Sequence, residues 1–297
     1  MIRQRNGHSL VELIVALPIA AILSTVAMSL LLDAHRLARR LQSSTEIARE
    51  LRQATAVLAS EIRPLSATDV ISWSDTSLEV QAMVGSGVVC AFTSPNVIDM
   101  LPLTGNDVLR TSWFATPQGG DNVWTIAPDT MPMPASERWA MSTMKMESSV
   151  AASLCTSRKL FAEGNAAATR VIRLTLSGTP TISPRTGTLV RITRRARYSL
   201  YKASDGLWYL GRKSLNPSGW TTIQPVAGPL DTPARKGLVV QMRDSADNIF
   251  NFGIARTPRG VALKLRAATQ WQKAGAKPGV VDSVLVHITL RGQGGGS

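Results

Sequence analysis

The residue types that most often perform catalysis or bind metals are few and widely separated in this sequence. Its three histidines, His8, His35 and His287, show none of the spacings typical of metal sites. The sequence has no Gly-x-Ser-x-Gly nucleophile elbow, no phosphate-binding Gly-Lys-Ser/Thr loop and no Cys-x-x-Cys pair. We therefore expect no enzymatic activity, no bound metal and no cofactor, which leaves binding and assembly as the functions to consider.

A second group of residues could recognise an anionic partner. Four aromatic residues are interspersed with seven basic ones, which are Arg191, Arg194, Arg195, Arg197, Lys202, Arg212 and Lys213. Basic groups with interleaved aromatics suit phosphate contacts and base stacking, so contact with DNA or an acidic neighbour is one interpretation. The other interpretation, which we favour, is a solvated strand face whose aromatic residues turn inward.

Composition limits the class of protein. The chain has 297 residues, 44% of them hydrophobic, and a net charge of +13. It is too apolar for global disorder, and its two cysteines and aperiodic glycines exclude a disulfide-dense or collagenous scaffold. The charge is +3 over residues 1–63, −5 over 64–169 and +15 over 170–297. The basic excess therefore belongs to the C-terminal part of the chain.

The two cysteines, Cys90 and Cys155, allow two interpretations. In an exported protein they could form a disulfide, which would be worth roughly 4 kcal/mol in the chain-entropy model. The alternative is a pair of buried free thiols.

A segment near the N-terminus is apolar enough to cross a membrane. Residues 10–32 contain a single charged side chain, Glu12, and as a helix they would span about 35 Å. A cleaved secretory signal would have a shorter apolar core and a better cleavage site. A plain anchor fits the length but does not explain Glu12, since a carboxylate inside a membrane costs roughly 2.5–3.5 kcal/mol. In a plain anchor, Glu12 would have to reach the lipid headgroups.

The order of residues around Glu12 indicates a third possibility. Arg3 and Arg5 precede Gly7, His8 follows it, and Glu12 lies near the start of the apolar run. This order resembles the leader and helix start of type IV prepilins and type II secretion pseudopilins. That family has a short basic leader ending in Gly, followed by an apolar helix with Glu at its fifth mature residue.

The resemblance implies processing and assembly roles for three residues. A prepilin peptidase would cut between Gly7 and His8 and methylate the new amine of His8, although the first mature residue of the family is commonly Phe. Glu12 would pair with the N-terminal amine of a neighbouring pilin or pseudopilin subunit. The same leader serves pili and type II secretion systems, so the resemblance does not separate a minor pilin from a pseudopilin.

The resemblance also implies a single-pass inner-membrane protein with a periplasmic head, which later joins a pilus or pseudopilus. A count of basic residues alone predicts the opposite orientation, because five arginines follow the span within about twenty residues. We give precedence to the resemblance, since Asp33, Glu46 and Glu50 reduce the net positive charge of that second cluster.

The helix is predicted to continue beyond the membrane, to Arg63, where Pro64 would end it. A kink or local melting is expected at Pro18. Apolar residues that recur at helical spacing predict a stripe packed on the head, formed by Leu37, Leu41, Ala48, Leu51, Leu58 and Ile62. The expected parts are a leader (1–7), a membrane or filament-core helix (8–32), an amphipathic continuation (33–63), a β-rich head (64–291) and a flexible tail (292–297).

The fold class expected is α+β, with the long helix packed on an antiparallel, meandering sheet. The pattern predicts a loop over residues 116–136 and a short helix within 135–159. The order of the later segments resembles PilW-type minor pilins and J-type pseudopilins, from Tyr198 through Trp208 to a final strand over 282–290. Strands are predicted at residues 78–84, 88–92, 108–114, 190–200, 207–210, 238–243, 249–254, 261–267 and 284–290.

Overall fold

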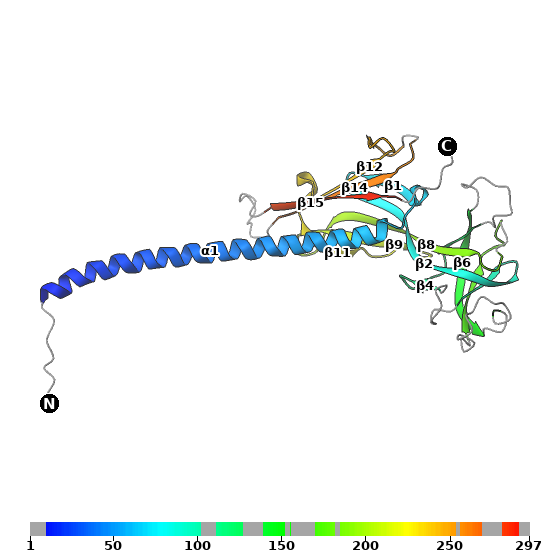
Figure 1. The fold of residues 1–297 in the computed structure, drawn as a ribbon, viewed down its shortest axis with the longest axis horizontal. Helices are drawn as coiled ribbons and strands as arrows, with labels where there is room; N and C mark the ends of the chain where they lie inside the picture. Colours follow the sequence, from blue (N-terminus) through cyan, green and yellow to red (C-terminus); the bar gives the residue numbers. More distant parts are fainter. Residues whose placement is uncertain are drawn as a thin grey trace, which may run out of the picture. The chain divides into compact units, whose positions relative to one another are not determined.

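The computed structural model describes residues 10–101, 111–126, 139–151, 155, 170–181, 185–253, 256–268 and 281–290 (Figure 1). The leader 1–7, His8 and the tail 292–297 lie outside these residues. The chain divides into two compact units, one of Met1–Arg49 with Ala268–Asp282 and the other of Glu50–Ala267 with Ser283–Ser297. The described elements make the protein an α+β chain, as predicted.

Helix α1 runs without a break from Leu10 to Ile62 (Figure 1). Its C-terminal end falls one residue before the predicted Arg63, whose N–H still donates to the carbonyl of Ala59 at 3.0 Å. The helix continues through Pro18, so the local melting expected there does not occur. A proline removes one backbone hydrogen bond, and the turns on either side of Pro18 keep theirs.

The C-terminal turns of α1 have one fully buried face within the second unit. Leu51, Ala54, Leu58 and Ile62 are at most 3% exposed and recur at spacings of three and four residues. Leu37 and Leu41, which were predicted to extend this face, are instead 58% and 59% exposed. Both residues belong to the first unit, whereas the buried face belongs to the second.

Six antiparallel strands of the second unit form a closed ring. The hydrogen-bonded order is β2-β3-β7-β6-β5-β8 and back to β2. Strand β2 closes the ring because its first part, to Val88, pairs with β8, whereas its last part, from Val89, pairs with β3. The strands are β2 (Ser77–Ser94), β3 (Val97–Met100), β5 (Asn122–Ile126), β6 (Trp139–Ala151), β7 (Arg170–Leu176) and β8 (Leu189–Lys202).

The ring has a core to which every one of its strands contributes. Period-two alternation sends one set of side chains from each strand into a shared interior. The buried members are Val84, Val89, Ile98, Met100, Val123, Met144, Ile172, Leu174, Leu176, Val190 and Ile192.

Three predictions about this region were wrong in detail. The strands predicted at 78–84 and 88–92 are one strand, β2. Strand β5 lies inside the predicted loop 116–136, and β6 occupies most of the described part of the predicted helix 135–159. Ladder pairing of β6 with both β5 and β7 outweighs the helical preference of its methionines, of which only Met144 is buried.

The remaining strands extend this sheet and form a second one. Strands β9 (Trp208–Asn216), β10 (Gly219–Trp220) and β11 (Gln224–Leu230) continue from β8, while β1 (Val70–Ser74) and β4 (Ser112–Trp113) pair with β2. The pairing is antiparallel, as predicted, but two sheets replace the single meander. The second sheet has the order β13-β12-β14-β15, made of Ile249–Phe250, Leu238–Arg243, Gly260–Ala268 and Val281–Thr289.

Candidate functional site

The first candidate site is the N-terminal segment, of which the structure describes the helical part. Gly7 and His8 lie outside the described residues, and Glu12 lies in the first turns of α1. Beyond it, every large apolar side chain from Ile14 to Leu32 is between 44% and 65% exposed. An apolar surface of this extent requires a cover of lipid or of other apolar helices. Among the described residues, α1 is the one helix long and apolar enough to cross a membrane.

The polar residues within this span satisfy their own hydrogen bonds. The hydroxyls of Ser24, Thr25 and Ser29 each donate to a backbone carbonyl three or four residues earlier, at 2.7–2.8 Å. A hydroxyl bonded to its own helix adds little cost in an apolar surrounding. These three residues therefore do not interrupt the apolar character of the span.

The second candidate site is the basic cluster, whose seven members lie on strands β8 and β9. Two of them bind buried carboxylates from distant parts of the chain. Arg191 Nη2 lies 2.8 Å from Asp69, and Arg194 donates through Nε and Nη2 to both oxygens of Asp121 at 2.6 and 2.8 Å. Both aspartates are at most 3% exposed. These arginines neutralise buried acids, and their charge is not free for an external anion.

Two further arginines also have carboxylate partners. Arg195 Nε pairs with Glu79 of β2, and Arg212 Nε lies 3.3 Å from Glu61 of α1. Burial raises the pKa of Glu61 above its ordinary value, and the charge of Arg212 opposes that rise. Four of the seven basic residues thus join β8 or β9 to other elements of the second unit.

The remaining three are Arg197, Lys202 and Lys213, which have no carboxylate partner among the described residues. Lys202 is exposed at the end of β8. Arg197 Nη2 donates to the Ser77 hydroxyl at 3.4 Å, and Lys213 Nζ lies 4.8 Å from the ring centroid of Trp220. The basic charge of the cluster that lacks a carboxylate partner among the described residues therefore belongs to Arg197, Lys202 and Lys213.

The aromatic residues near the cluster do not present stacking faces in a row. Tyr198 is 2% exposed and its hydroxyl accepts from Arg212 Nε at 3.1 Å. The Tyr209 hydroxyl donates to Asp205 at 2.7 Å, and this hydrogen bond is the main cause that raises the pKa of Tyr209 to about 12. Tyr201 packs against Tyr209 with ring centroids 6.2 Å apart.

Trp220 is the aromatic residue that contacts the basic cluster through its ring, and the sequence reasoning missed it. It lies on β10, which returns against β9 so that Trp220 pairs with Leu215. The signal was available, because Asn216-Pro217-Ser218-Gly219 between two apolar segments is typical of a tight turn. A hairpin at that turn brings Trp220 beside Lys213.

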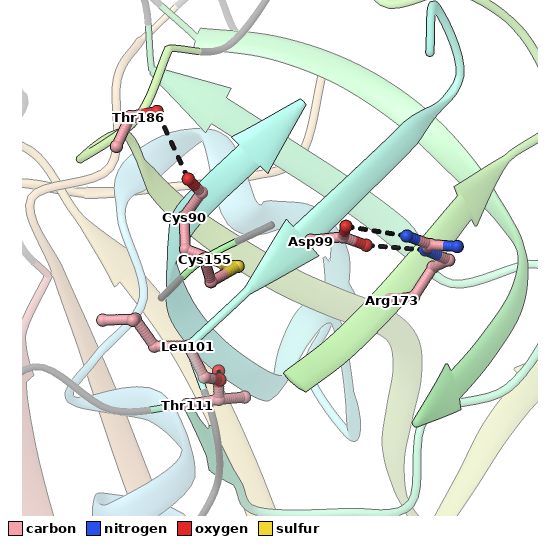
Figure 2. The surroundings of a disulfide bond; sticks show 7 residues. All are labelled: Cys90, Asp99, Leu101, Thr111, Cys155, Arg173 and Thr186. Atoms are coloured by element: carbon pink, nitrogen blue, oxygen red, sulfur yellow. Dashed lines mark hydrogen bonds and ion pairs between the residues drawn. A yellow bond between two sulfur atoms is a disulfide. The ribbon is translucent and has the colours of Figure 1, made fainter. Parts of the chain in front are cut away.

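The third candidate site is the pair of cysteines, Cys90 and Cys155, which form a disulfide (Figure 2). The two Cα atoms are 5.3 Å apart, and both side chains are fully buried. The Cys90 carbonyl accepts from the Thr186 hydroxyl at 3.3 Å. Nearby, Arg173 Nε and Nη2 donate to both carboxylate oxygens of Asp99, at 2.7 and 2.8 Å, which ties β7 to β3 (Figure 2).

Comparison of the chain with protein-family models, with curated proteins and with solved structures found no match. Within the described residues no group of histidine, cysteine or acidic side chains is arranged to hold a metal ion.

Proposed function

We propose that this protein is a minor pilin or a type II secretion pseudopilin, which a prepilin peptidase processes and which joins a pilus or pseudopilus. The observation that carries the proposal is the single helix α1, whose first half exposes an apolar surface on all sides. The Gly7-to-Glu12 pattern stands directly before that surface. A disulfide in the β-rich head supports an oxidising compartment such as the periplasm.

Processing is the most direct test of this proposal. Co-expression with a prepilin peptidase should shorten the chain by residues 1–7, and intact-mass measurement would detect both this loss and any methyl group on His8. Gly7→Val should abolish cleavage, while Asn6→Ala, next to it, should leave cleavage intact. A chain of unchanged mass in the presence of an active peptidase would refute the proposal.

Orientation gives a second, independent test. A reporter that is active only in the periplasm, fused after Arg63, should be active in the full-length context of α1. A cytoplasmic reporter fused at the same position should be inactive. The reverse pattern would exclude a periplasmic head and with it the pilin assignment.

A second candidate function is a membrane-tethered protein that binds DNA or another anionic partner without polymerising. Arg197 and Lys213 favour an anionic partner, because neither forms an ion pair with a carboxylate among the described residues. The ion pairs of Arg191, Arg194, Arg195 and Arg212 argue against a long DNA contact, which needs several free cations along the backbone. Binding of DNA at about 50 mM salt that weakens steeply as salt rises would support the DNA version.

A further inference from the structure

Two of the three basic cluster residues without a carboxylate partner face a hollow in the second unit. Its volume is about 550 Å³, and it lies where the β1–β2 turn meets the ends of β8, β9 and β10. Arg197 and Lys213 line it from neighbouring strands. A hollow of this size accommodates a ligand of one or two sugar rings, within the range typical of small-molecule sites.

The register of the strands explains why the cations meet there. Arg197 lies directly opposite Lys213 of β9 on one side and Glu79 of β2 on the other. Glu79 pairs with Arg195 rather than with Arg197. Like charges directly opposite each other repel, so an anion between Arg197 and Lys213 would be attracted by both.

Successive residues of β9 point to opposite faces of the sheet, so the hollow and the packed helix lie on different faces. Arg212, next to Lys213, points to the opposite face and reaches Glu61 of α1. Lys213 lines the hollow from the other face. Trp220 fixes two cations over this face, since Lys213 Nζ and the Arg195 guanidinium carbon lie 4.8 and 5.8 Å from its ring centroid.

The rest of the lining combines hydroxyl groups with a small apolar area. Leu200, Trp220 and Ile223 supply the apolar part. Each hydroxyl can donate one hydrogen bond and accept two, so it retains capacity for a ligand even when it has one protein partner. The hydroxyl residues are Ser74, Thr76, Ser77, Ser199 and Thr221.

We propose that this hollow binds an acidic sugar, a mono- or disaccharide unit that carries a carboxylate. The carboxylate would lie between Arg197 and Lys213, where charge-assisted hydrogen bonds are strongest. The ring hydroxyls would meet the serine and threonine side chains, and the apolar ring face would meet Leu200 and Ile223. Inorganic phosphate would use the cations alone, and a DNA strand needs a longer run of free cations than this hollow supplies.

Calorimetric titration of the full-length protein in detergent tests the proposal. The probes are digalacturonic acid, the neutral disaccharide lactose, inorganic phosphate and a single-stranded 12-nucleotide DNA. Digalacturonic acid should bind at least about tenfold more tightly than lactose, the minimum expected for hydrogen bonds to a charged group. Equal affinity for the two disaccharides, or tighter binding of phosphate or DNA than of digalacturonic acid, would overturn it.

Two substitutions and a matched control locate the binding. Arg197→Gln and Lys213→Gln should each weaken digalacturonic acid binding about tenfold or more. Lys202→Gln removes the same charge from the same strand outside the hollow and should change the affinity by less than about twofold. Thermal unfolding of each variant, measured beside the parent, separates lost binding from lost folding. Unchanged affinity in both variants would refute the site.

The result is independent of the pilin proposal. Leader cleavage and reporter orientation can fail while the acidic sugar still binds, and the reverse also holds. Loss of digalacturonic acid binding in Lys202→Gln but not in Lys213→Gln would place the site elsewhere on the basic strands and overturn the assignment to this hollow.

Discussion

Glu61 is a residue whose environment reverses the usual pH dependence of a carboxylate. Its pKa is raised by burial, so the folded state holds the proton more tightly than the unfolded chain. Its contribution to stability is therefore fully present below the ordinary value of 4.5 and falls as the pH rises through the folded-state pKa. We expect the unfolding free energy of the parent, minus that of Glu61→Gln, to decrease between pH 4 and pH 7.

Denaturant titration of both proteins in detergent at several pH values measures this difference. Glu46→Gln, an exposed change on the same helix, serves as the control and should show no such decrease. A parent that gains stability over Glu61→Gln as the pH rises would show that the attraction to Arg212 outweighs burial.

Asp121 is a buried partner of the basic region whose loss should be costly. Its carboxylate accepts two hydrogen bonds from Arg194 and one from the Gln118 N–H, and it is 2% exposed. Asp121→Ala leaves the Arg194 guanidinium, 11% exposed, without its partner. We expect a loss of about 3–5 kcal/mol in unfolding free energy.

Asp33 provides the comparison for this prediction, because its pair with Arg36 is largely exposed. Asp33→Ala should cost less than about 1 kcal/mol. The same denaturant measurement applies to both variants. Equal losses at the two positions would mean that burial does not strengthen the dependence on Asp121.

The sequence revealed which residues are basic but not which of them are neutralised. The partners of Arg191, Arg194 and Arg195 lie 122, 73 and 116 residues away in the chain, so no local pattern connects them. The favoured interpretation of inward-turned aromatics fits Tyr198, which is buried, but overlooked Trp220. A long-range strand register is what separates the paired arginines from Arg197 and Lys213.

Among the elements, α1 was the most predictable because its signal is local. The unbroken apolar run, the helical spacing of its residues and the terminating Pro64 can each be recognised from residues within a few helical turns of one another. The closure of the ring was not predictable, since it depends on β2 being long enough to pair with β8 and β3 at once. Short apolar segments such as that of β6 fit helix or strand until their neighbours are known.

The buried face of α1 gives a prediction at this scale. Leu58 is 2% exposed, and Leu58→Ala should lower the unfolding free energy by about 2–5 kcal/mol through lost burial and the cavity that remains. Leu41→Ala makes the same chemical change at a position that is 59% exposed, and should alter it by less than about 0.5 kcal/mol. Thermal or denaturant unfolding in detergent would compare them, and similar losses would contradict the assignment of the packed face.

In the molecule as a whole, the disulfide links stability to the compartment of the head. Cys90 and Cys155 are 65 residues apart, so replacing both with serine should reduce unfolding free energy by about 4 kcal/mol. A reducing agent should lower the stability of the parent similarly and leave the double variant unchanged. Parent protein isolated from an oxidising compartment that retains two free thiols by mass spectrometry would refute the pairing.

Under the proposed pilin function, Glu12 separates two requirements on the whole molecule, insertion into the membrane and assembly. As the one charged residue between positions 10 and 32, it opposes insertion, and Glu12→Leu should favour insertion by roughly 2.5–3.5 kcal/mol or more. If its carboxylate serves to pair with the amine of a neighbouring subunit, the same substitution should reduce incorporation into filaments. Membrane fractionation would therefore show equal or greater retention, while sheared filaments would contain less of the protein. Loss of membrane retention together with assembly would instead indicate damage to α1. Unchanged incorporation would leave Glu12 as a residue tolerated near the headgroups of a plain anchor.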